Sequence, residues 1–327
     1  MIISRTPLRI SLGGGGTDLP AFYETQGHGF LIAAAITKYI YIAVNHRFDE
    51  EILVKYSKLE KVTNLNDIQH PLLRECLKSV DARGSIEISA MADIPGGTGL
   101  GSSGAFAVGA LKALNMHFHK APERHRLAEE ACEIEMNYLS EPVGKQDPYI
   151  AAYGGVTGFS FHADGTVEVQ PLDMAPRLRA LLDDNLLLFY TGIQRAASEV
   201  LAEEALTGPF ETNSRSDNLK RTRAIGYETR DALVAGDMDG FAKLLTQQWR
   251  LKYERQPNPL NGRFDNWIKS GLDAGALGGK LVGAGGGGFL LFYADKKTDL
   301  RDVMSEFGLH ETFFDIDYEG STIIVAR

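Results

Sequence analysis

The segment that decides the fold is Pro95-Gly96-Gly97-Thr98-Gly99-Leu100-Gly101-Ser102-Ser103-Gly104. It follows a strand-like run, Ser85 to Ala92, and leads into a helix-like run, Gly101 to Phe118. Glycines at a strand-to-helix turn let backbone N–H groups approach a ligand closely, and the helix start adds unpaired donors and a positive dipole end. The segment therefore predicts an anion site suited to nucleotide phosphates, with a plain glycine-rich turn as the alternative.

Two further glycine clusters lie near the ends of the chain. The first, Gly13 to Gly16, follows a strand-like run and presents Thr17 and Asp18, either of which could instead cap a helix. The second, Gly283 to Gly288, stands between two strand-like runs, so it lacks the helix that a dinucleotide fingerprint requires. We expect this cluster to approach a ligand or another stretch of backbone closely.

The three clusters, in this order, resemble the motifs of the GHMP kinase family, which includes galactokinase, homoserine kinase, mevalonate kinase and phosphomevalonate kinase. The central motif of the family is Pro-x3-Gly-Leu-Gly-Ser-Ser-Ala, and Gly104 is the only departure from it here, one that we expect to be without consequence. The resemblance covers essentially the whole chain. It implies an α+β, two-domain fold with a ferredoxin-like C-terminal domain and an active site in the interdomain cleft. On this basis we divide the chain into residues 1–175 and 176–327, because no hinge is evident in the sequence.

Hydrophobic periodicity outlines the elements of both halves. The predicted strands are Ile2–Leu12, Ile32–Ala35, Tyr39–Asn45, Ile52–Tyr56, Ser85–Ala92, Val156–Phe161, Val167–Pro171, Asn185–Tyr190, Phe289–Tyr293, Thr312–Asp317 and Thr322–Ala326. The predicted helices are Gly101–Phe118, Pro122–Leu139, Ser198–Ala205, Ser214–Ala235, Gly240–Tyr253, Arg263–Ala274 and Leu300–Phe307.

The resemblance also implies cofactors and their ligands. ATP would bind through its phosphates along Pro95 to Gly104, and the Ser103 hydroxyl would contact Mg²⁺. A carboxylate from the helix Pro122–Leu139 would complete the protein's share of the magnesium site, because Mg²⁺ takes oxygen ligands and keeps several waters. Family comparison favours Glu135 over Glu133, although both could be solvated acids on a helix face.

The resemblance places the catalytic residues at Asp147 and Arg9. Asp147 would take the proton from an anomeric hydroxyl, unless it merely caps a helix that begins at Pro148. Arg9 would offset charge in the transition state, since its guanidinium is always ionised.

The opening segment Thr6 to Asp18 looks most like that of sugar-1-kinases acting on D-glycero-D-manno-heptose 7-phosphate, with fucokinase domains as the nearest rival. The expected reaction is ATP-dependent phosphorylation of the anomeric hydroxyl to the 1,7-bisphosphate, which would feed nucleotide-activated heptose and surface glycan synthesis. Arg195 and Lys145 are the candidate cations for the 7-phosphate. The expected substrate-binding residues are Gly15, Gly16, Thr17, Asp18, Arg195, Gly285 and Gly286.

Bulk properties limit the remaining possibilities. The net charge of −9 argues against a general nucleic-acid binder, and no apolar run approaches the ~20 residues of a membrane span. Two cysteines, Cys76 and Cys132, do not make a disulfide framework, so we expect a cytoplasmic protein. We expect it to be a monomer or a homodimer, and its partner to be a small sugar phosphate. Two other classes stay open: a catalytically silent sugar and ATP sensor, and a nicotinamide oxidoreductase built on a G-x-G-x-x-G match.

Overall fold

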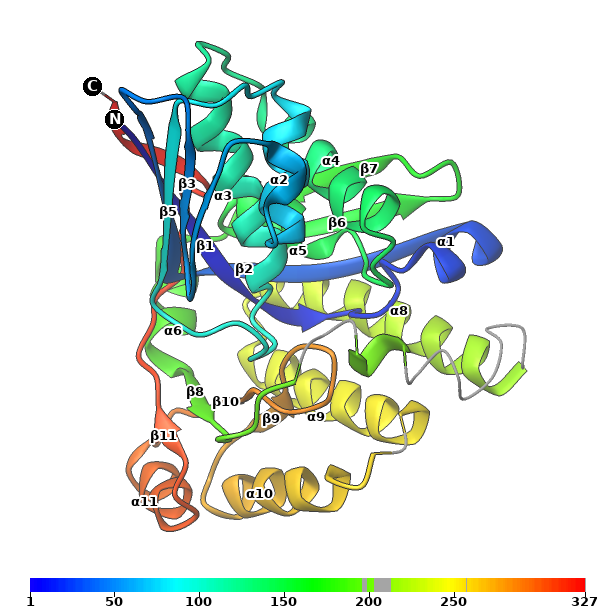
Figure 1. Cartoon of the computed structure of the whole chain (residues 1–327). Helices are drawn as coiled ribbons and strands as arrows, with labels where there is room; N and C mark the ends of the chain where they lie inside the picture. Colours follow the sequence, from blue (N-terminus) through cyan, green and yellow to red (C-terminus); the bar gives the residue numbers. More distant parts are fainter. Residues whose placement is uncertain (196–198, 203–212, 257, 327) are drawn as a thin grey trace.

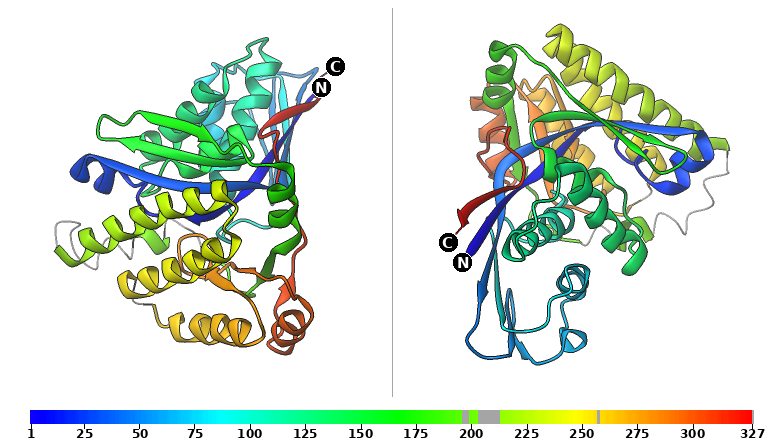
Figure 2. Two further views of the ribbon diagram at one scale, coloured as in Figure 1. Left: turned by 180° about the vertical axis from the view of Figure 1, so that it is seen from behind. Right: turned by 90° about the horizontal axis from the view of Figure 1, so that it is seen from above.

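The computed structural model describes residues 1–195, 199–202, 213–256 and 258–326. Its described part contains two β-sheets, with helices packed on both and between them (Figure 1). The two ends of the chain lie side by side, since Ile2 on the first strand pairs with Ala326 on the last (Figures 1 and 2).

The larger sheet is built around two long antiparallel strands, β1 (Ile2–Gly13) and β2 (His28–His46). Its strand order is β12-β1-β2-β5-β3-β4, and a hairpin of two further strands attaches to β2. The other strands are β3 (Ile52–Lys55), β4 (Leu59–Val62), β5 (Ile86–Ala92), β6 (Val156–His162), β7 (Val167–Pro171) and β12 (Thr322–Ala326).

Strand β2 replaces the two strands predicted at Ile32–Ala35 and Tyr39–Asn45. The register against β1 shifts between Pro7 and Leu8, where proline has no N–H to donate to the ladder. On its other edge, β2 pairs first with β6 and then with β5. One strand therefore links the part of the sheet that holds β6 and β7 to the part that holds β3, β4 and β5.

A layer of helices covers one face of this sheet, and α8 (Asn213–Ala235) lies against the other (Figure 1). The helix predicted at Pro122–Leu139 begins at Arg124 and changes at Ile134 into a five-residue π-helix, η2 (Ile134–Tyr138). The remaining elements of this half are α1 (Pro20–Gln26), a 3₁₀ turn η1 (Leu65–Asp67), α2 (Pro71–Ser79), α3 (Ser102–His117), α4 (Arg124–Glu133) and α5 (Gln146–Tyr153).

The second sheet has the antiparallel order β11-β8-β10-β9. Numbered along the chain, this is 4-1-3-2, with helices after the first and third strands, which confirms the predicted ferredoxin-like arrangement. Its strands are β8 (Leu186–Tyr190), β9 (Gly278–Leu281), β10 (Phe289–Tyr293) and β11 (His310–Glu311). The helices are α6 (Pro176–Asn185), α9 (Met238–Arg255), α10 (Asn261–Asp273) and α11 (Thr298–Glu306).

Both faces of the second sheet are buried. In β8, Leu187 and Phe189 belong to a core with α10 and α11, whereas Leu186 and Leu188 belong to the core of the larger sheet. This double burial explains why β8 reads as an uninterrupted apolar run. The core of the larger sheet includes residues from both sides of position 175, and β12 near the C-terminus pairs with β1. The two halves are therefore interlocked, and the boundary at 175 stays a prediction.

Several local predictions need correction. The strand predicted at Thr312–Asp317 is extended chain with a single bridge, Ile36 to Ile316. Neither Thr17 nor Asp18 caps α1, whose N-cap position is Leu19. Of the helix predicted at Ser198–Ala205, residues 199–202 are helical, and the other four lie outside the described residues.

Candidate active site

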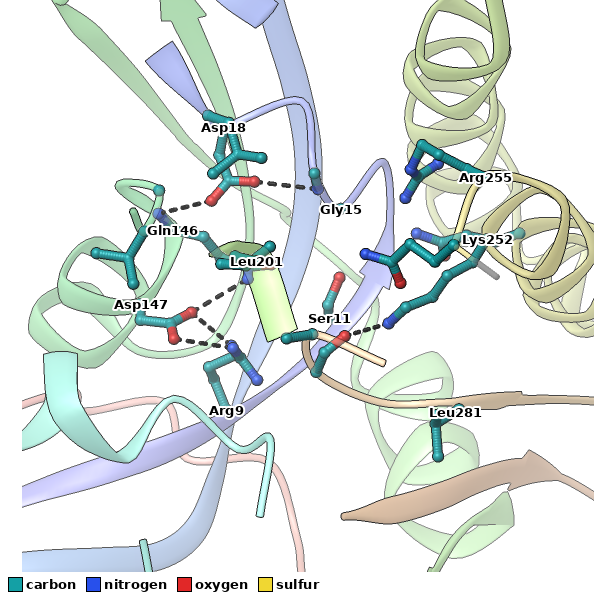
Figure 3. Close-up of a pocket in the computed structure, with 18 of the residues that line it drawn as sticks. Arg9, Ser11, Gly15, Asp18, Gln146, Asp147, Leu201, Lys252, Arg255 and Leu281 are labelled. Carbon is teal, nitrogen blue, oxygen red and sulfur yellow. Dashed lines mark hydrogen bonds and ion pairs between the residues drawn. The ribbon is translucent and has the colours of Figure 1, made fainter. Parts of the chain in front are cut away.

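A cavity lies where the larger sheet meets α9 and the second sheet (Figure 3). It brings together seven residues that were predicted from separate parts of the sequence: Arg9, Gly15, Gly16, Asp18, Ser103, Glu135 and Asp147. Of the predicted phosphate segment Pro95 to Gly104, Ser103 is the only member among the described residues that line the cavity, and Asp147 lines it too. The turn around Leu100 lies behind Arg9, whose backbone N–H donates to the Leu100 carbonyl oxygen. The cavity is the candidate active site.

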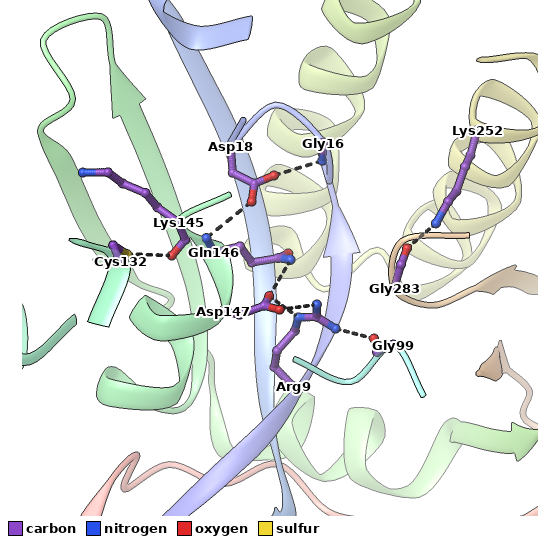
Figure 4. A network of polar contacts seen from close by, with 10 residues as sticks. All are labelled: Arg9, Gly16, Asp18, Gly99, Cys132, Lys145, Gln146, Asp147, Lys252 and Gly283. Carbon is purple, nitrogen blue, oxygen red and sulfur yellow. Dashed lines mark hydrogen bonds and ion pairs between the residues drawn. The ribbon is translucent and has the colours of Figure 1, made fainter. Parts of the chain in front are cut away.

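Asp147 is held by Arg9 in a two-point ion pair. The Nε and Nη2 atoms of Arg9 donate to the two carboxylate oxygens at 2.7 and 2.8 Å (Figure 4). The third donor, Nη1, goes to the carbonyl oxygen of Gly99, and the backbone N–H of Arg9 donates to Leu100. Asp147 is the second residue of α5, so it is not a cap, and its carboxylate faces the cavity.

Two glycines make room for this pair. A Cβ on Gly101 would lie 3.0 Å from the Arg9 Cγ and 3.1 Å from the Asp147 Cγ, and Gly101 adopts the left-handed conformation, with φ 74°. A Cβ on Gly104 would lie 2.8 Å from both the Asp147 Cβ and the Pro148 Cδ. The departure from the alanine of the family motif therefore matters for packing, contrary to our expectation: glycine at 104 lets α3 lie closer to Asp147 and Pro148 of α5 than alanine would.

The last glycine cluster packs against the segment Pro95 to Gly104. A Cβ on Gly283 would lie 2.5 Å from the Gly99 Cα, and one on Gly288 would lie 2.0 Å from the Thr98 carbonyl oxygen. The backbone N–H of Arg195 donates to the Gly97 carbonyl at 2.9 Å. This cluster joins β9 to β10, as predicted, and supports the loop that starts α3.

Asp18 is buried beside Asp147. Its carboxylate accepts from the backbone N–H groups of Gly16 at 3.1 Å and Gln146 at 3.4 Å (Figure 4). A Cβ on Gly144 would lie 2.1 Å from one Asp18 carboxylate oxygen, so glycine there is what admits the side chain. Burial, and next the charge of Asp147, raise the pKa of Asp18 above its ordinary value.

Thr17 does not line the cavity among the described residues, contrary to the expected substrate contact. Its hydroxyl donates to the carbonyl oxygens of Gly14 and Phe30, both at 2.9 Å, and accepts from the Phe30 N–H. Thr17 is fully buried, so its hydroxyl holds the first glycine cluster onto β2.

Glu135 lies in the π-helix η2 and reaches the cavity next to Ser103. The side chain is 4% exposed, and burial raises its pKa to about 7, while a hydrogen bond from Ser103 acts in the opposite direction. A buried carboxylate and a hydroxyl at the start of α3 are hard oxygen donors. They fit Mg²⁺, which takes one or two protein oxygens when phosphates and water supply the others. No cluster of three or more metal-binding side chains occurs among the described residues.

The opposite side of the cavity is basic, and sequence reasoning missed it. Lys252 and Arg255 reach it from the last turn of α9 (Figure 3). Lys280, on β9, also lines the cavity. Lys252 donates to the Gly283 carbonyl, Arg255 to Asn218 at 2.7 Å, and Lys280 to the Gln248 side chain at 2.8 Å. Burial, Lys252 and then Arg9 lower the pKa of Lys280 well below its ordinary value. The one signal available in the sequence was Lys280 itself, which stands three residues before the last glycine cluster.

Other predicted residues are placed elsewhere. Arg195, Gly285 and Gly286 are not among the described residues that line the cavity, which the last cluster reaches through Gly283 and Ala284. Lys145 faces away, because its ammonium group binds Glu129 at 3.1 Å and the Gly165 carbonyl at 2.7 Å. Both cysteines are buried free thiols. Across the described ranges, no helix has the length and apolar character that a membrane crossing requires.

Comparisons with known proteins show which family the chain resembles. Family profiles match residues 68–155 (GHMP kinases N terminal domain) and 229–309 (GHMP kinases C terminal). The D-glycero-alpha-D-manno-heptose 7-phosphate kinase of Campylobacter jejuni is 29% identical over 91% of both chains, and the galactokinase of Pyrococcus furiosus is 26% identical over 96% of both.

Among solved structures, a D-glycero-D-manno-heptose 1-phosphate kinase from Bacteroides thetaiotaomicron superposes with a TM-score of 0.81 over the full length of both chains, at 23% identity. A phosphomevalonate kinase of Streptococcus pneumoniae superposes with a TM-score of 0.79 over 97% of this chain and 100% of its own, at 14% identity. The chain therefore belongs to the GHMP kinase family and is a sugar kinase, a phosphotransferase with an alcohol as acceptor.

Proposed function

We propose that this chain transfers the γ-phosphoryl group of ATP to the anomeric hydroxyl of D-glycero-D-manno-heptose 7-phosphate, giving the 1,7-bisphosphate. The observation that carries the proposal is a cavity with a carboxylate–guanidinium pair on one side and a cluster of cations on the other. ATP is the phosphoryl donor of the family. Two relatives carry heptose phosphate kinase in their names, although these names differ in the position of the phosphate.

Asp147 is the proposed base. The Arg9 pair holds both oxygens of its carboxylate, which fixes the orientation of the carboxylate in the cavity. The carboxylate takes the hydroxyl proton as the oxygen attacks the γ-phosphorus, and in such a reaction placement matters more than basicity. Because the described donors of Arg9 go to Asp147 and Gly99, we assign Arg9 to positioning Asp147 in addition to offsetting charge.

The segment Pro95 to Gly104 is the proposed triphosphate site. It ends at the start of α3, where backbone N–H groups have no partner within the helix, and this is the arrangement that binds phosphate oxygens. Ser103 and Glu135 are the proposed protein ligands of Mg²⁺. Bound there, the cation would neutralise charge that develops on the phosphate oxygens.

Lys252 and Arg255 are the proposed ligands of the acceptor's own phosphate, in place of Arg195 and Lys145. Both line the cavity across from Asp18 and Asp147 (Figure 3). A sugar that bridges the cavity would place its anomeric hydroxyl at Asp147 and its phosphate at α9. Arg255 also approaches the first glycine cluster, since its Nη2 lies 3.4 Å from where a Cβ on Gly16 would stand.

The test is ADP release with Mg-ATP across D-glycero-D-manno-heptose 7-phosphate, mannose 6-phosphate, galactose, L-fucose and mevalonate. We expect kcat/KM to be highest for the heptose 7-phosphate, and the product to carry phosphate at both ends. A clear preference for an unphosphorylated sugar would contradict the proposal and move the assignment to a galactokinase-like or fucokinase-like enzyme.

A further inference from the structure

Two polar atoms in the cavity have no hydrogen-bond partner among the described residues, the Ser11 Oγ and the Gln146 Oε1. The two residues are only 7% and 8% exposed. Buried polar atoms of a folded protein are nearly always hydrogen-bonded, so each exception requires an explanation. A bound ligand that supplies the missing partners is one such explanation, and both atoms lie in the same cavity.

The orientation of Gln146 shows which atom it offers. Its Nε2 donates to the Asp147 carboxylate at 3.1 Å, and its backbone N–H donates to Asp18 (Figures 3 and 4). Turning the amide around would set the Oε1 against the ionised carboxylate, so the carboxylate determines the assignment. The oxygen left over is purely an acceptor and therefore requires a donor from the ligand.

Ser11 stands two residues beyond Arg9 on β1, so the two side chains project from the same face of the strand. Gly15 keeps the approach to Ser11 open, because a Cβ on Gly15 would lie 3.0 Å from the Ser11 Oγ. The backbone of Gly15 is not in the left-handed region, so flexibility does not require glycine at this position. Glycine is required here because a larger residue would fill the space in front of the Ser11 hydroxyl.

We propose that Ser11 and Gln146 bind two hydroxyl groups of the acceptor, beside the hydroxyl that faces Asp147. The inference rests on the proposed function in one respect, that the acceptor is a sugar. A hydroxyl donates to the Gln146 Oε1, and a second one exchanges a hydrogen bond with the Ser11 Oγ. The two residues thus select a polyhydroxylated acceptor by contacts on both sides of the reacting oxygen.

The test compares Ser11→Ala, Gln146→Met and Gly15→Ala with the controls Ser79→Ala and Gln69→Met, which alter a helix-end serine and an exposed glutamine. The probe is whichever sugar or sugar phosphate of the panel above has the highest kcat/KM. We expect each of the three variants to raise the KM for that probe at least tenfold and to leave the KM for ATP within twofold. The rise in Tm that the probe causes without ATP is expected to fall by at least half.

Monodeoxy analogues of the probe separate contact from general damage. For wild type, kcat/KM is expected to be at least tenfold lower with the analogue that lacks the contacted hydroxyl than with the probe itself. For the variant that lacks the matching side-chain contact, the same comparison is expected to give a difference of less than threefold. Acceptor KM values within twofold of the controls, or equal rises in KM for ATP and acceptor, would overturn the inference. A different preferred sugar would overturn only the heptose assignment. A panel in which no sugar is turned over or shifts the Tm would overturn both.

Discussion

The two sides of the cleft are built in different ways. On the acidic side, Asp18 and Asp147 have short side chains that pack against glycines at 101, 104 and 144. A Cβ built on any of these glycines would lie only 2.1 to 3.1 Å from an atom of one of the two aspartates. On the basic side, Lys252 and Arg255 extend long side chains from α9. The position of the carboxylates is thus set by close packing, whereas the position of the cations is set by long side chains that extend into the cavity.

This difference matches two different tasks. Proton transfer requires an oxygen held to within a fraction of an ångström of its place, which a short side chain on packed backbone provides. Recognition of a phosphate depends on charge and tolerates several geometries, which flexible lysine and arginine side chains supply. We therefore expect substitutions on the acidic side to lower kcat and substitutions on the basic side to raise the acceptor KM.

The largest effect is expected for Asp147→Asn. The amide keeps the shape of the side chain but cannot take a proton, and it loses the ionic part of the Arg9 pair. We expect kcat to fall by about 10³-fold or more, within the range seen for loss of a general base. A steady-state assay of ADP release at saturating acceptor measures it.

The control is Asp273→Asn, an exposed residue at the end of α10. It is expected to leave kcat unchanged. An Asp147→Asn enzyme that turns over as fast as wild type would show that Asp147 is not the base.

Much of the acidic side could be predicted from the sequence because each of its groups stands next to a recognisable motif. Asp18 follows the first glycine cluster, and Asp147 lies in a segment that resembles one in the family. The basic side could not be predicted in this way, because Lys252 and Arg255 look like ordinary solvated residues of a helix. Only the packing of α9 against the cleft distinguishes them from Lys243, which the same helix exposes.

The elements that the sequence missed fail for related reasons. Short helices such as α1 and α6 contain too few turns for a periodic pattern to emerge. The two strands predicted between Ile32 and Asn45 are one strand, because β2 changes partners at a point where its apolar pattern is interrupted. The π-helix that carries Glu135 interrupts a helix that the sequence predicted as regular from Pro122 to Leu139.

The second prediction concerns Glu135 and pH. Its pKa is about 7 in the folded protein, against an ordinary value of 4.5, because burial disfavours the charged form. The folded state therefore binds the proton more tightly, and this contribution to stability is complete below pH 4.5 and lost as pH rises through 7. The loss is about 3 kcal/mol, since one pKa unit corresponds to about 1.4 kcal/mol.

Glu135→Gln removes this loss. In the absence of Mg²⁺, the variant is expected to exceed wild type in free energy of unfolding by about 3 kcal/mol at pH 8, and by little at pH 4.5. Urea denaturation at the two pH values measures the difference. Glu130→Gln, on the preceding helix α4, is the matched control, and the prediction fails if both variants respond to pH in the same way.

The third prediction concerns the basic side. Lys252→Met keeps the length of the side chain and removes its charge. We expect the KM for a phosphorylated acceptor to rise by about tenfold to a hundredfold, the value of a hydrogen bond to a charged group, with kcat nearly unchanged. For the same sugar without its phosphate, the change is expected to stay below threefold. Lys243→Met is the control, and equal effects on both acceptors would assign Lys252 to the fold instead.

The smallest effect is expected for Gly104→Ala, which restores the alanine of the family motif. The added Cβ would lie 2.8 Å from the Asp147 Cβ and 2.9 Å from the Pro148 N, so α5 has to move by a few tenths of an ångström. Because the carboxylate moves with it, we expect kcat to fall about threefold to tenfold, with the KM for ATP unchanged. Alanine also favours the helix by up to about 1 kcal/mol, so stability need not fall with activity.

Gly262→Ala is the matched control for Gly104→Ala. Gly262 also lies in the first turn of a helix, α10, but a Cβ there would meet no atom within 4 Å. It is expected to gain the same helix preference and to keep full activity. If Gly104→Ala also keeps wild-type kcat, the position of Asp147 does not depend on backbone packing behind it, and the contrast between a rigid acidic side and a flexible basic side is wrong.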